Sequence, residues 1–375
     1  MDNPALTIGL AMALGMMSQV IARKFHLPGI VVLLASGVIF GPDGLSWIQP
    51  SSLGPALQII VGFAVAVILF EGGMNLRISR IKREELAIRG LITIGALITL
   101  IGGTLAALII LGWDFRTSIL FGTLIIVTGP TVITPLLKRV RLHHGVSTVL
   151  EAEGILLDAI GAIIAVVALE IALSPSGLSF IKGLFHIVSR LTIGTIMGIA
   201  GGGLLTLLFR IRKLIPDGLE NVFILSWVFA LFQLANTASP ESGIAAVTIA
   251  GMTIGNSKTY IQKELLEFKE QLTVLMIGML FILLAADVRI TDIQLLGLKG
   301  VLTVLFLMLV IRPLSVFVAT ANSDLDTRHK LLLSWIAPRG IVAAAVASLF
   351  AFELNQHGYD GAQLRALVFL LITMT

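Results

Sequence analysis

The strongest constraint in this sequence is a succession of apolar stretches, each long enough to cross the hydrocarbon core of a bilayer. A helix that spans this core needs roughly 17 to 25 mostly apolar residues. Of the 375 residues, 57% are hydrophobic and only 13% are charged, and the mean hydropathy is +1.00. These values lie far from those of a soluble domain. The chain therefore has the composition of an all-helical integral membrane protein.

Thirteen apolar stretches are predicted to span the membrane, the ninth of them short. They cover 5–22, 29–46, 55–75, 86–112, 117–138, 147–172, 190–209, 219–237, 242–256, 266–287, 296–319, 330–351 and 363–375. The last stretch is still apolar where the sequence stops. We therefore expect a natural chain that continues, with room for a C-terminal cytoplasmic domain.

The distribution of basic residues predicts the orientation of these spans. The loops after odd-numbered spans hold 17 of the 26 Lys and Arg residues, and the opposite loops hold six. Cytoplasmic loops carry the excess of Lys and Arg. The N-terminus is thus predicted outside and the C-terminus in the cytoplasm, in a multi-pass protein of a prokaryotic plasma membrane. The basic balance follows from topology and indicates no nucleic-acid partner.

Two predicted spans, 117–138 and 330–351, contain a Gly/Pro break in the middle of an apolar run. The breaks read VTGPT and APRG and lie about 209 residues apart. Two six-span halves, 1–172 and 216–375, then match in opposite orientation, with 173–215 holding a connecting span. Matched breaks in inverted halves indicate a transporter with its binding site near the midplane. Irregular backbone at this depth must be covered by protein or by a water-filled cavity.

Asp158 is the predicted ion-site acid, because it lies near the middle of the span 147–172. Gly154, Gly161 and Ala162 share its helix face, and such small residues allow another backbone to approach closely. Burial disfavours the charged form of a carboxylate, so Asp158 could exchange a proton for a metal cation. The alternative is an Asp that only bonds a neighbouring helix.

Other charged residues also lie at membrane depth, where charged side chains are usually paired or functional. Glu153 and Arg312 lie at the same depth in their spans, and we predict a buried, structural ion pair between them. Arg339 lies in the second break, where a cation could neutralise the negative ends of two half-helices. Glu71, near a span end, fits an interfacial acid or an ion pathway equally well.

Six motifs carry a family resemblance, in order along most of the chain: LFEGGMNL, TGPTVITPLL, EGILLDA, SGIAAVTIAGMTIGN, IRPLSV and PRGIVAAAVA. Together they resemble the monovalent cation/proton antiporters of the sodium/proton exchanger (NHE and NhaP) type. The resemblance implies a fold of about 13 helices in two inverted repeats with two unwound crossing helices. It also implies a homodimer.

The resemblance implies that Asp158 binds either the cation or the proton, with Thr128 contributing oxygen to the Na⁺ or K⁺. Glu71, Thr131 and Gly154 complete the expected ion- and proton-binding set. It also implies the pair of Glu153 with Arg312. Three positions depart from the family: Gly129 replaces the Asp of Thr-Asp-Pro, Gly154 replaces a Ser, and Leu157 replaces an Asn or Asp.

The predicted function is exchange of Na⁺, or of K⁺ or Li⁺, for protons by alternating access, without a cofactor. A single titrating carboxylate favours electroneutral one-for-one exchange. A Kef-like potassium efflux system with a C-terminal nucleotide-binding domain is the transport alternative. A channel is also open, although a buried titratable acid suits exchange better. No enzyme is expected, because the sequence contains no His-Glu-x-x-His or Gly-x-Ser-x-Gly motif and no paired catalytic aspartates.

Overall fold

The computed structural model describes residues 3–129, 144–173, 179–211, 215–216, 219–257, 264–337 and 339–375. Every regular element within these ranges is a helix, as the sequence predicts. The first part of the chain forms α1 (Pro4–Lys24), α2 (Gly29–Phe40), α3 (Ala56–Asn75) and α4 (Ile78–Ile81). It continues with α5 (Glu85–Gly90), α6 (Ala96–Ala106), α7 (Phe115–Leu124) and α9 (His144–Leu173).

The second part of the chain begins with the longest helix, α10 (Ser179–Arg210). It continues with α11 (Glu220–Ala238), α12 (Ser242–Gly255), α13 (Glu264–Asp287), α14 (Ile290–Phe306) and α15 (Arg312–Ala319). It ends with α16 (Thr327–Trp335), α17 (Ile341–Gln356) and α18 (Ala362–Met374). Short helical turns, Pro50–Leu53 among them, link some of these helices.

Each of the thirteen predicted spans coincides with helix in the described residues. In the part of the chain that the structure describes, seven helices are long and apolar enough to cross a membrane, and five shorter apolar helices correspond to further spans. The first half of span 117–138 is α7, and its second half lies outside the described residues. The second predicted span is shorter than expected because α2 ends at Phe40. Gly41 precedes Pro42, and a residue before proline disfavours helical backbone; Gly41 is extended instead.

Two long spans contain π-helical turns. One span joins α5 to α6 through Leu91–Gly95, and the other joins α14 to α15 through Leu307–Ile311. The second π turn directly precedes Arg312 and Pro313. Proline lacks an N–H and clashes with the carbonyl one turn earlier in a regular helix. A wider turn accommodates that ring within the membrane and rotates the residues that follow, including Arg312.

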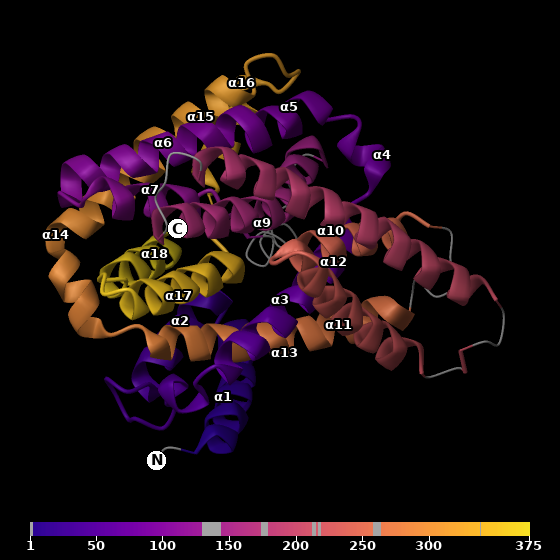
Figure 1. Cartoon of the computed structure of the whole chain (residues 1–375), viewed down its shortest axis with the longest axis horizontal. Coiled ribbons are helices and arrows are strands. Elements are labelled where there is room, and N and C mark those ends of the chain that lie inside the picture. Colours follow the sequence, from indigo (N-terminus) through magenta and orange to yellow (C-terminus); the bar gives the residue numbers. More distant parts are fainter. Residues whose placement is uncertain are drawn as a thin grey trace.

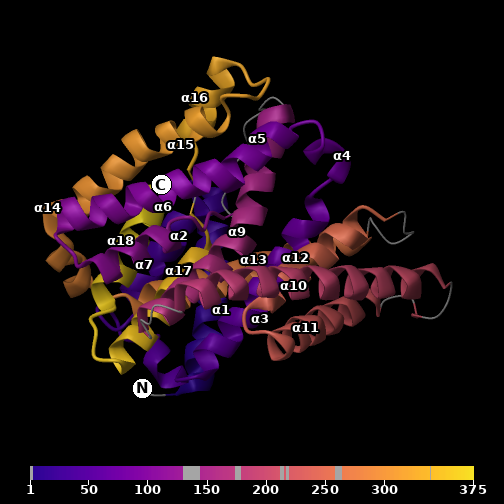
Figure 2. The ribbon, with the colours of Figure 1, turned by 45° about the horizontal axis from the view of Figure 1, so that its top comes forward.

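A ridge of glycines packs α10 against α12. A Cβ atom on Gly194, Gly198 or Gly202 would lie 2.6 to 2.8 Å from the carbonyl oxygens of Ser242, Ala246 and Ala250 respectively. Small residues at four-residue spacing let membrane helices approach this closely. Helix α12 also packs along α3, so it is held between two neighbours. In Figure 2, α10 runs alongside α11 and α12 toward the right of the view.

The helices that carry the breaks lie in the middle of the molecule. Figure 1 shows α7, α9, α17 and α18 between the helices α5, α6 and α15 above them and α2 and α13 below. Phe121 of α7, Phe281 of α13 and Phe350 of α17 are fully buried in the main apolar cluster. This packing surrounds the interrupted backbone with protein.

Candidate functional site

The two breaks cross each other at a pair of glycines. The first break follows α7, and the second separates α16 from α17. A Cβ atom on Gly129 would lie 2.2 Å from the Cα of Gly340, and one on Gly340 would lie 2.5 Å from the Cα of Gly129. Contacts this short with backbone atoms leave no room for any side chain. The crossing therefore explains why glycine, and not the family's Asp, occupies position 129.

Arg339 holds the C-terminal end of the first half-helix. Its Nη1 donates to the carbonyl oxygen of Ile125 and, at 3.3 Å, to that of Val127. These carbonyls follow the last turn of α7, where no helical N–H is available. The guanidinium is buried and presents its charge to the negative end of the helix. The contact agrees with a charge-compensating role, which remains a prediction.

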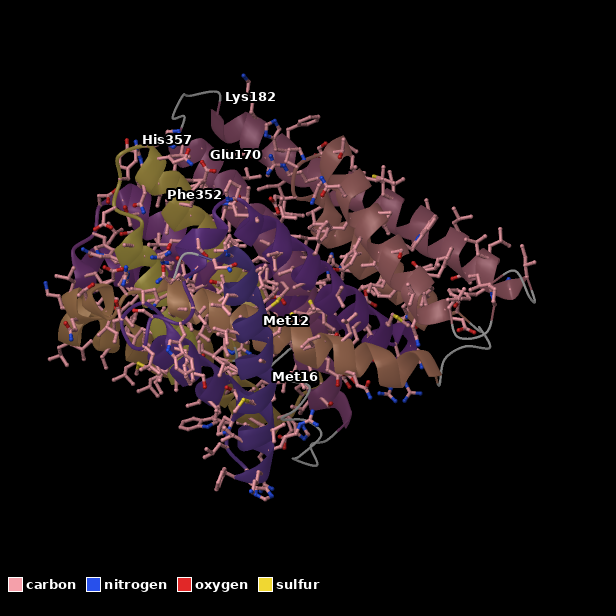
Figure 3. All side chains as sticks on the ribbon, turned by 90° about the horizontal axis from the view of Figure 1, so that it is seen from below. Met12, Met16, Glu170, Lys182, Phe352 and His357 are labelled. Carbon is pink, nitrogen blue, oxygen red and sulfur yellow. The ribbon has the colours of Figure 1, made fainter. Side chains whose placement is uncertain are left out.

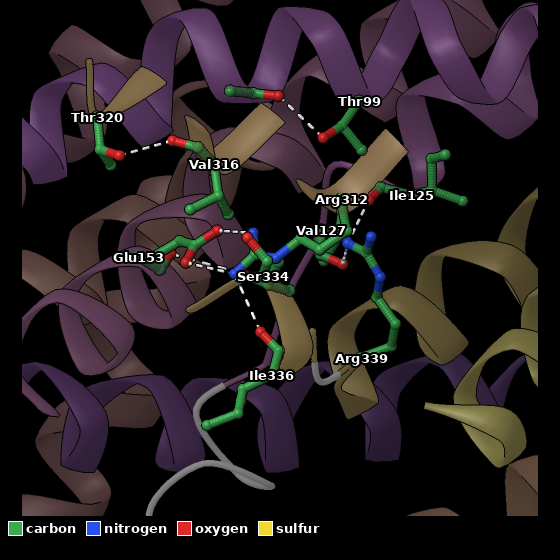
Figure 4. Close-up of polar contacts among 12 residues, drawn as sticks. Thr99, Ile125, Val127, Glu153, Arg312, Val316, Thr320, Ser334, Ile336 and Arg339 are labelled. Atoms are coloured by element: carbon green, nitrogen blue, oxygen red, sulfur yellow. Dashed lines mark hydrogen bonds and ion pairs between the residues drawn. The ribbon is translucent and has the colours of Figure 1, made fainter. Parts of the chain in front are cut away.

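Arg312 contacts the end of the other half-helix, a contact that sequence reasoning missed. Its Nη2 donates to the carbonyl oxygen of Ile336, just after α16, at 3.1 Å. The same guanidinium binds both carboxylate oxygens of Glu153, with Nη2 to Oε2 at 3.0 Å and Nη1 to Oε1 closer still. Both side chains are more than 90% buried. Figure 4 shows Arg312 with Glu153 and the carbonyl group of Ile336, and Arg339 with the carbonyl groups of Ile125 and Val127.

Asp158 lies on α9 and is 1% exposed. Its Oδ1 has no hydrogen-bond partner among the residues that the structure describes. An unpartnered buried acceptor is costly and usually marks a proton, an ion or a water site. The small-residue face of α9 packs against the first break, because a Cβ on Gly161 would lie 3.2 Å from the backbone nitrogen of Val127. The helix that carries Asp158 thus touches the interrupted backbone directly.

Thr128 is buried in the first break and also faces α9. Its Oγ1 lies 3.5 Å from the carbonyl oxygen of Glu153, a long hydrogen bond, and Gly154 beside that carbonyl is buried. Glu71 lies on α3, half-buried, and α3 packs against α9. Thr131 lies outside the described residues. The described residues contain no group of three or more His, Asp or Glu that could hold a metal.

Comparison with known proteins gives one consistent result. The family model described as "Sodium/hydrogen exchanger, transmembrane" matches residues 9–375. The Na⁺/H⁺ antiporter 1 of Methanocaldococcus jannaschii is 28% identical over 367 residues, which cover 92% of this chain and 83% of that protein. The K⁺/H⁺ antiporter NhaP2 of Shewanella oneidensis is 28% identical over 96% of this chain. This match spans only 62% of the Shewanella protein.

A solved structure shares the fold. The sodium proton antiporter MjNhaP1 from Methanocaldococcus jannaschii at pH 8 superposes with a TM-score of 0.86 and 25% identity. The match covers 98% of this chain and 96% of that one. These relatives are transporters and not enzymes. The chain belongs to the transmembrane sodium/hydrogen exchanger family.

Proposed function

We propose that this protein exchanges a monovalent cation for protons across the membrane by alternating access. Asp158 binds either the cation or a proton. The observation that carries the proposal is the buried Asp158 carboxylate, whose Oδ1 finds no hydrogen-bond partner among the described residues. Relatives named as Na⁺/H⁺ and K⁺/H⁺ antiporters support the class of transported ions.

Competition for one carboxylate couples the two fluxes. An ionised carboxylate buried in the protein interior is unstable unless a cation or a proton neutralises it. The site of Asp158 therefore changes its accessibility from one side of the membrane to the other only with a cation or a proton bound. Exchange is then one-for-one and electroneutral. Thr128 supplies an oxygen to the cation from the broken backbone, with Glu71, Thr131 and Gly154 completing the pathway and its surroundings. The transported ion is Na⁺, or K⁺ or Li⁺ with the same carboxylate.

The moving part comprises predicted spans 4 to 6 and 11 to 13, which carry both breaks and the buried charges. The remaining spans form a scaffold. The two inverted halves, 1–172 and 216–375, each contribute three spans to the moving part. The N-terminus lies outside, the C-terminus lies in the cytoplasm, and two copies associate as a homodimer in a prokaryotic plasma membrane.

The test uses purified protein in proteoliposomes with an imposed pH gradient. Addition of Na⁺, Li⁺ or K⁺ should dissipate the gradient with wild-type protein and fail to do so with Asp158→Asn. Asp324→Asn is the matched control, because Asp324 is exposed and makes no contact with the crossing. Cation-driven proton flux that persists in Asp158→Asn would overturn the mechanism. A rate that responds to a membrane potential clamped with an ionophore would exclude electroneutral exchange.

A further inference from the structure

A second charge cluster, in which the arginine is buried and Glu170 is 44% exposed, joins α9 to the scaffold at the end of α9 that our topology places outside. Nη2 of Arg190, on α10, donates to both carboxylate oxygens of Glu170, on α9, at 2.7 and 3.0 Å. Arg190 is 5% exposed, and its Nη1 is buried with no hydrogen-bond partner among the described residues. The guanidinium thus binds Glu170 through Nη2, and its Nη1 is left without a partner in the described residues.

A second carboxylate, that of Glu241, comes within range of the charge of Arg190. Gly194, one turn after Arg190, packs against the backbone of Ser242, so Arg190 comes beside Glu241, the residue before Ser242. Burial raises the pKa of Glu241, the charge of Arg190 lowers it, and the charge of Glu170 raises it again. The carboxyl group of Glu241 therefore responds to both members of the pair.

Glu241 is held rigidly in an unusual backbone conformation. Its φ is +63°, in the left-handed region that residues other than glycine rarely adopt. The turn around it is locked, because Ser242 Oγ donates to the carbonyl oxygen of Ala235 and the Gly243 N–H donates to Oδ1 of Asn236. The turn places a carboxylate, at a position whose backbone favours glycine, where the charge of Arg190 acts on it, although no ion pair joins the two in the described residues. Backbone strain of this kind is found at functional positions.

The charged groups around Glu241 come from two helices. Glu170 of α9 and Arg190 of α10 act on Glu241 through their charges. Lys182 and His186 precede Arg190 on α10, and in the described residues neither α12 nor the last turns of α11 add a charge. Nδ1 of His186 lies 3.7 Å from Oε2 of Glu170, so a protonated His186 adds a second attraction to Glu170. Figure 3 places Glu170 and Lys182 at one end of the molecule, together with His357 of the turn after α17.

Helix α9 connects this cluster to the ion site. Glu170 follows Asp158 by twelve residues on one continuous helix, which corresponds to about 18 Å along the axis. Any displacement of α9 relative to α10 must therefore break or stretch the contact between Arg190 and Glu170. The cluster is placed to restrain the motion that alternating access requires.

We propose that Glu241 is a proton-dependent positioning residue for transport: Arg190 passes from Glu170 to a deprotonated Glu241 when α9 moves. With Glu241 protonated, Arg190 stays on Glu170 and restrains α9. With Glu241 charged, the two carboxylates compete for one guanidinium and α9 is released. Acidity on this side of the membrane thus slows the conformational step. This inference rests on the proposed function.

The test separates this effect from proton competition at Asp158. Exchange of labelled Na⁺ is measured in proteoliposomes with the same pH on both sides, from about pH 6 to about pH 9. Protons at Asp158 raise the KM for Na⁺, whereas protons at Glu241 lower the maximal rate. In wild type, the maximal rate should rise about fivefold with pH, a typical size for such coupling. In Glu241→Gln, it should stay at the acidic wild-type value while the KM still falls with pH.

Two further variants keep the proposal falsifiable. Glu241→Gly suits the left-handed backbone and should fold at least as well as wild type, with the same flat maximal rate. His186→Gln should retain the rise with pH. Asp292→Asn, which removes an acid from the same proposed face, is the matched control and should behave as wild type. A maximal rate that rises with pH in Glu241→Gln as in wild type overturns the inference. Absence of exchange in wild type with labelled Na⁺ and equally with K⁺ and Li⁺ overturns the proposed function instead.

Discussion

The two breaks are built from the same parts but differ in how their charges are balanced. Each half-helix ends on a carbonyl bound by a buried arginine: Arg339 at the end of α7 and Arg312 at the end of α16. Arg312 also binds Glu153, whereas no carboxylate lies within ion-pair distance of Arg339 in the described part of the chain. At the first break, the charge of Arg339 is therefore balanced only by the backbone carbonyls that it binds. At the second break, the charge of Arg312 is balanced by its ion pair with Glu153.

This difference shows how the first break is stabilised although position 129 holds no acid. Helix termini can be stabilised by a cation at their negative end without a carboxylate nearby. Arg339 makes that contact from the opposite break, so the second break supports the first, whereas Arg312 supports the second break from α15. Glu153 neutralises the neighbouring Arg312, which limits the net positive charge around the crossing. Four predictions test this comparison, from the largest expected effect to the smallest.

Glu153→Gln should give the largest loss of stability. It leaves the Arg312 guanidinium buried without its carboxylate, and breaking a buried pair costs about 3 to 5 kcal/mol. Thermal and denaturant unfolding in detergent micelles measure the loss. Removal of both charges, in Glu153→Gln with Arg312→Gln, should restore part of it. If Glu153→Gln unfolded like the exposed control Asp324→Asn, the second break would not depend on the pair.

Arg339→Gln should reduce the free energy of unfolding less than Glu153→Gln does. It removes hydrogen bonds to the carbonyls of Ile125 and Val127 but leaves no carboxylate unpaired. Hydrogen bonds from a charged group contribute about 1.5 to 3 kcal/mol. Arg339→Lys should retain part of this stability. The comparison fails if Arg339→Gln proves as destabilising as Glu153→Gln in the same unfolding assay.

Gly129→Ala should destabilise the crossing by about 1 to 3 kcal/mol, the usual cost of overpacking. The added methyl group would collide with the Gly340 backbone, and Gly129→Asp should be worse for the same reason. Gly203→Ala is the control, because a Cβ there meets nothing within 4 Å. That control should gain about 0.5 to 1 kcal/mol, since alanine favours helix interiors. Equal melting temperatures for both variants would contradict the close crossing.

Asp43→Asn should have the smallest effect, because this ion pair lies at the periphery. Asp43 accepts hydrogen bonds from the Ile290 N–H and from Arg289, each at 2.6 Å, and Arg289 is half exposed. Exposed pairs contribute under about 1 kcal/mol. If Asp43→Asn lowered the stability as much as Glu153→Gln, the peripheral pair would contribute as much as the central one, and the comparison would be wrong.

The pH dependence of this small effect has a definite sign. The Ile290 N–H, followed by Arg289, lowers the pKa of Asp43 below its ordinary value of 3.8, against the opposing effect of burial. A lowered folded-state pKa means that the stabilisation is complete above this ordinary value. It is lost as the pH falls through the folded-state pKa. The difference in melting temperature between wild type and Asp43→Asn should therefore persist down to about pH 4 and shrink only as the pH falls further, through the folded-state pKa.

Much of the fold could be predicted because the thickness of the bilayer core sets the length of an apolar helix that spans it. Each apolar stretch of that length therefore indicates one spanning helix. The contact between Glu153 and Arg312 could be anticipated because each charge is costly alone and both lie at one depth. The face of Gly154 and Gly161 on α9 follows from helical periodicity. The contact between Arg312 and Ile336 could not be anticipated, since a backbone carbonyl leaves no signal in the residue that carries it. Glu241 was missed because its turn looks like any short loop.

By itself, the sequence determined the membrane class, the helical spans, the two breaks and the acid at the middle of α9. These properties depend on the composition and order of neighbouring residues, and hydrophobic length and periodicity express them directly. Only the tertiary structure decided that Gly129 meets Gly340, that Arg339 and Arg312 hold the ends of α7 and α16, and that Arg190 of α10 pairs with Glu170 of α9. Such contacts depend on the rotation and approach of helices distant in sequence, which close packing of the whole chain determines.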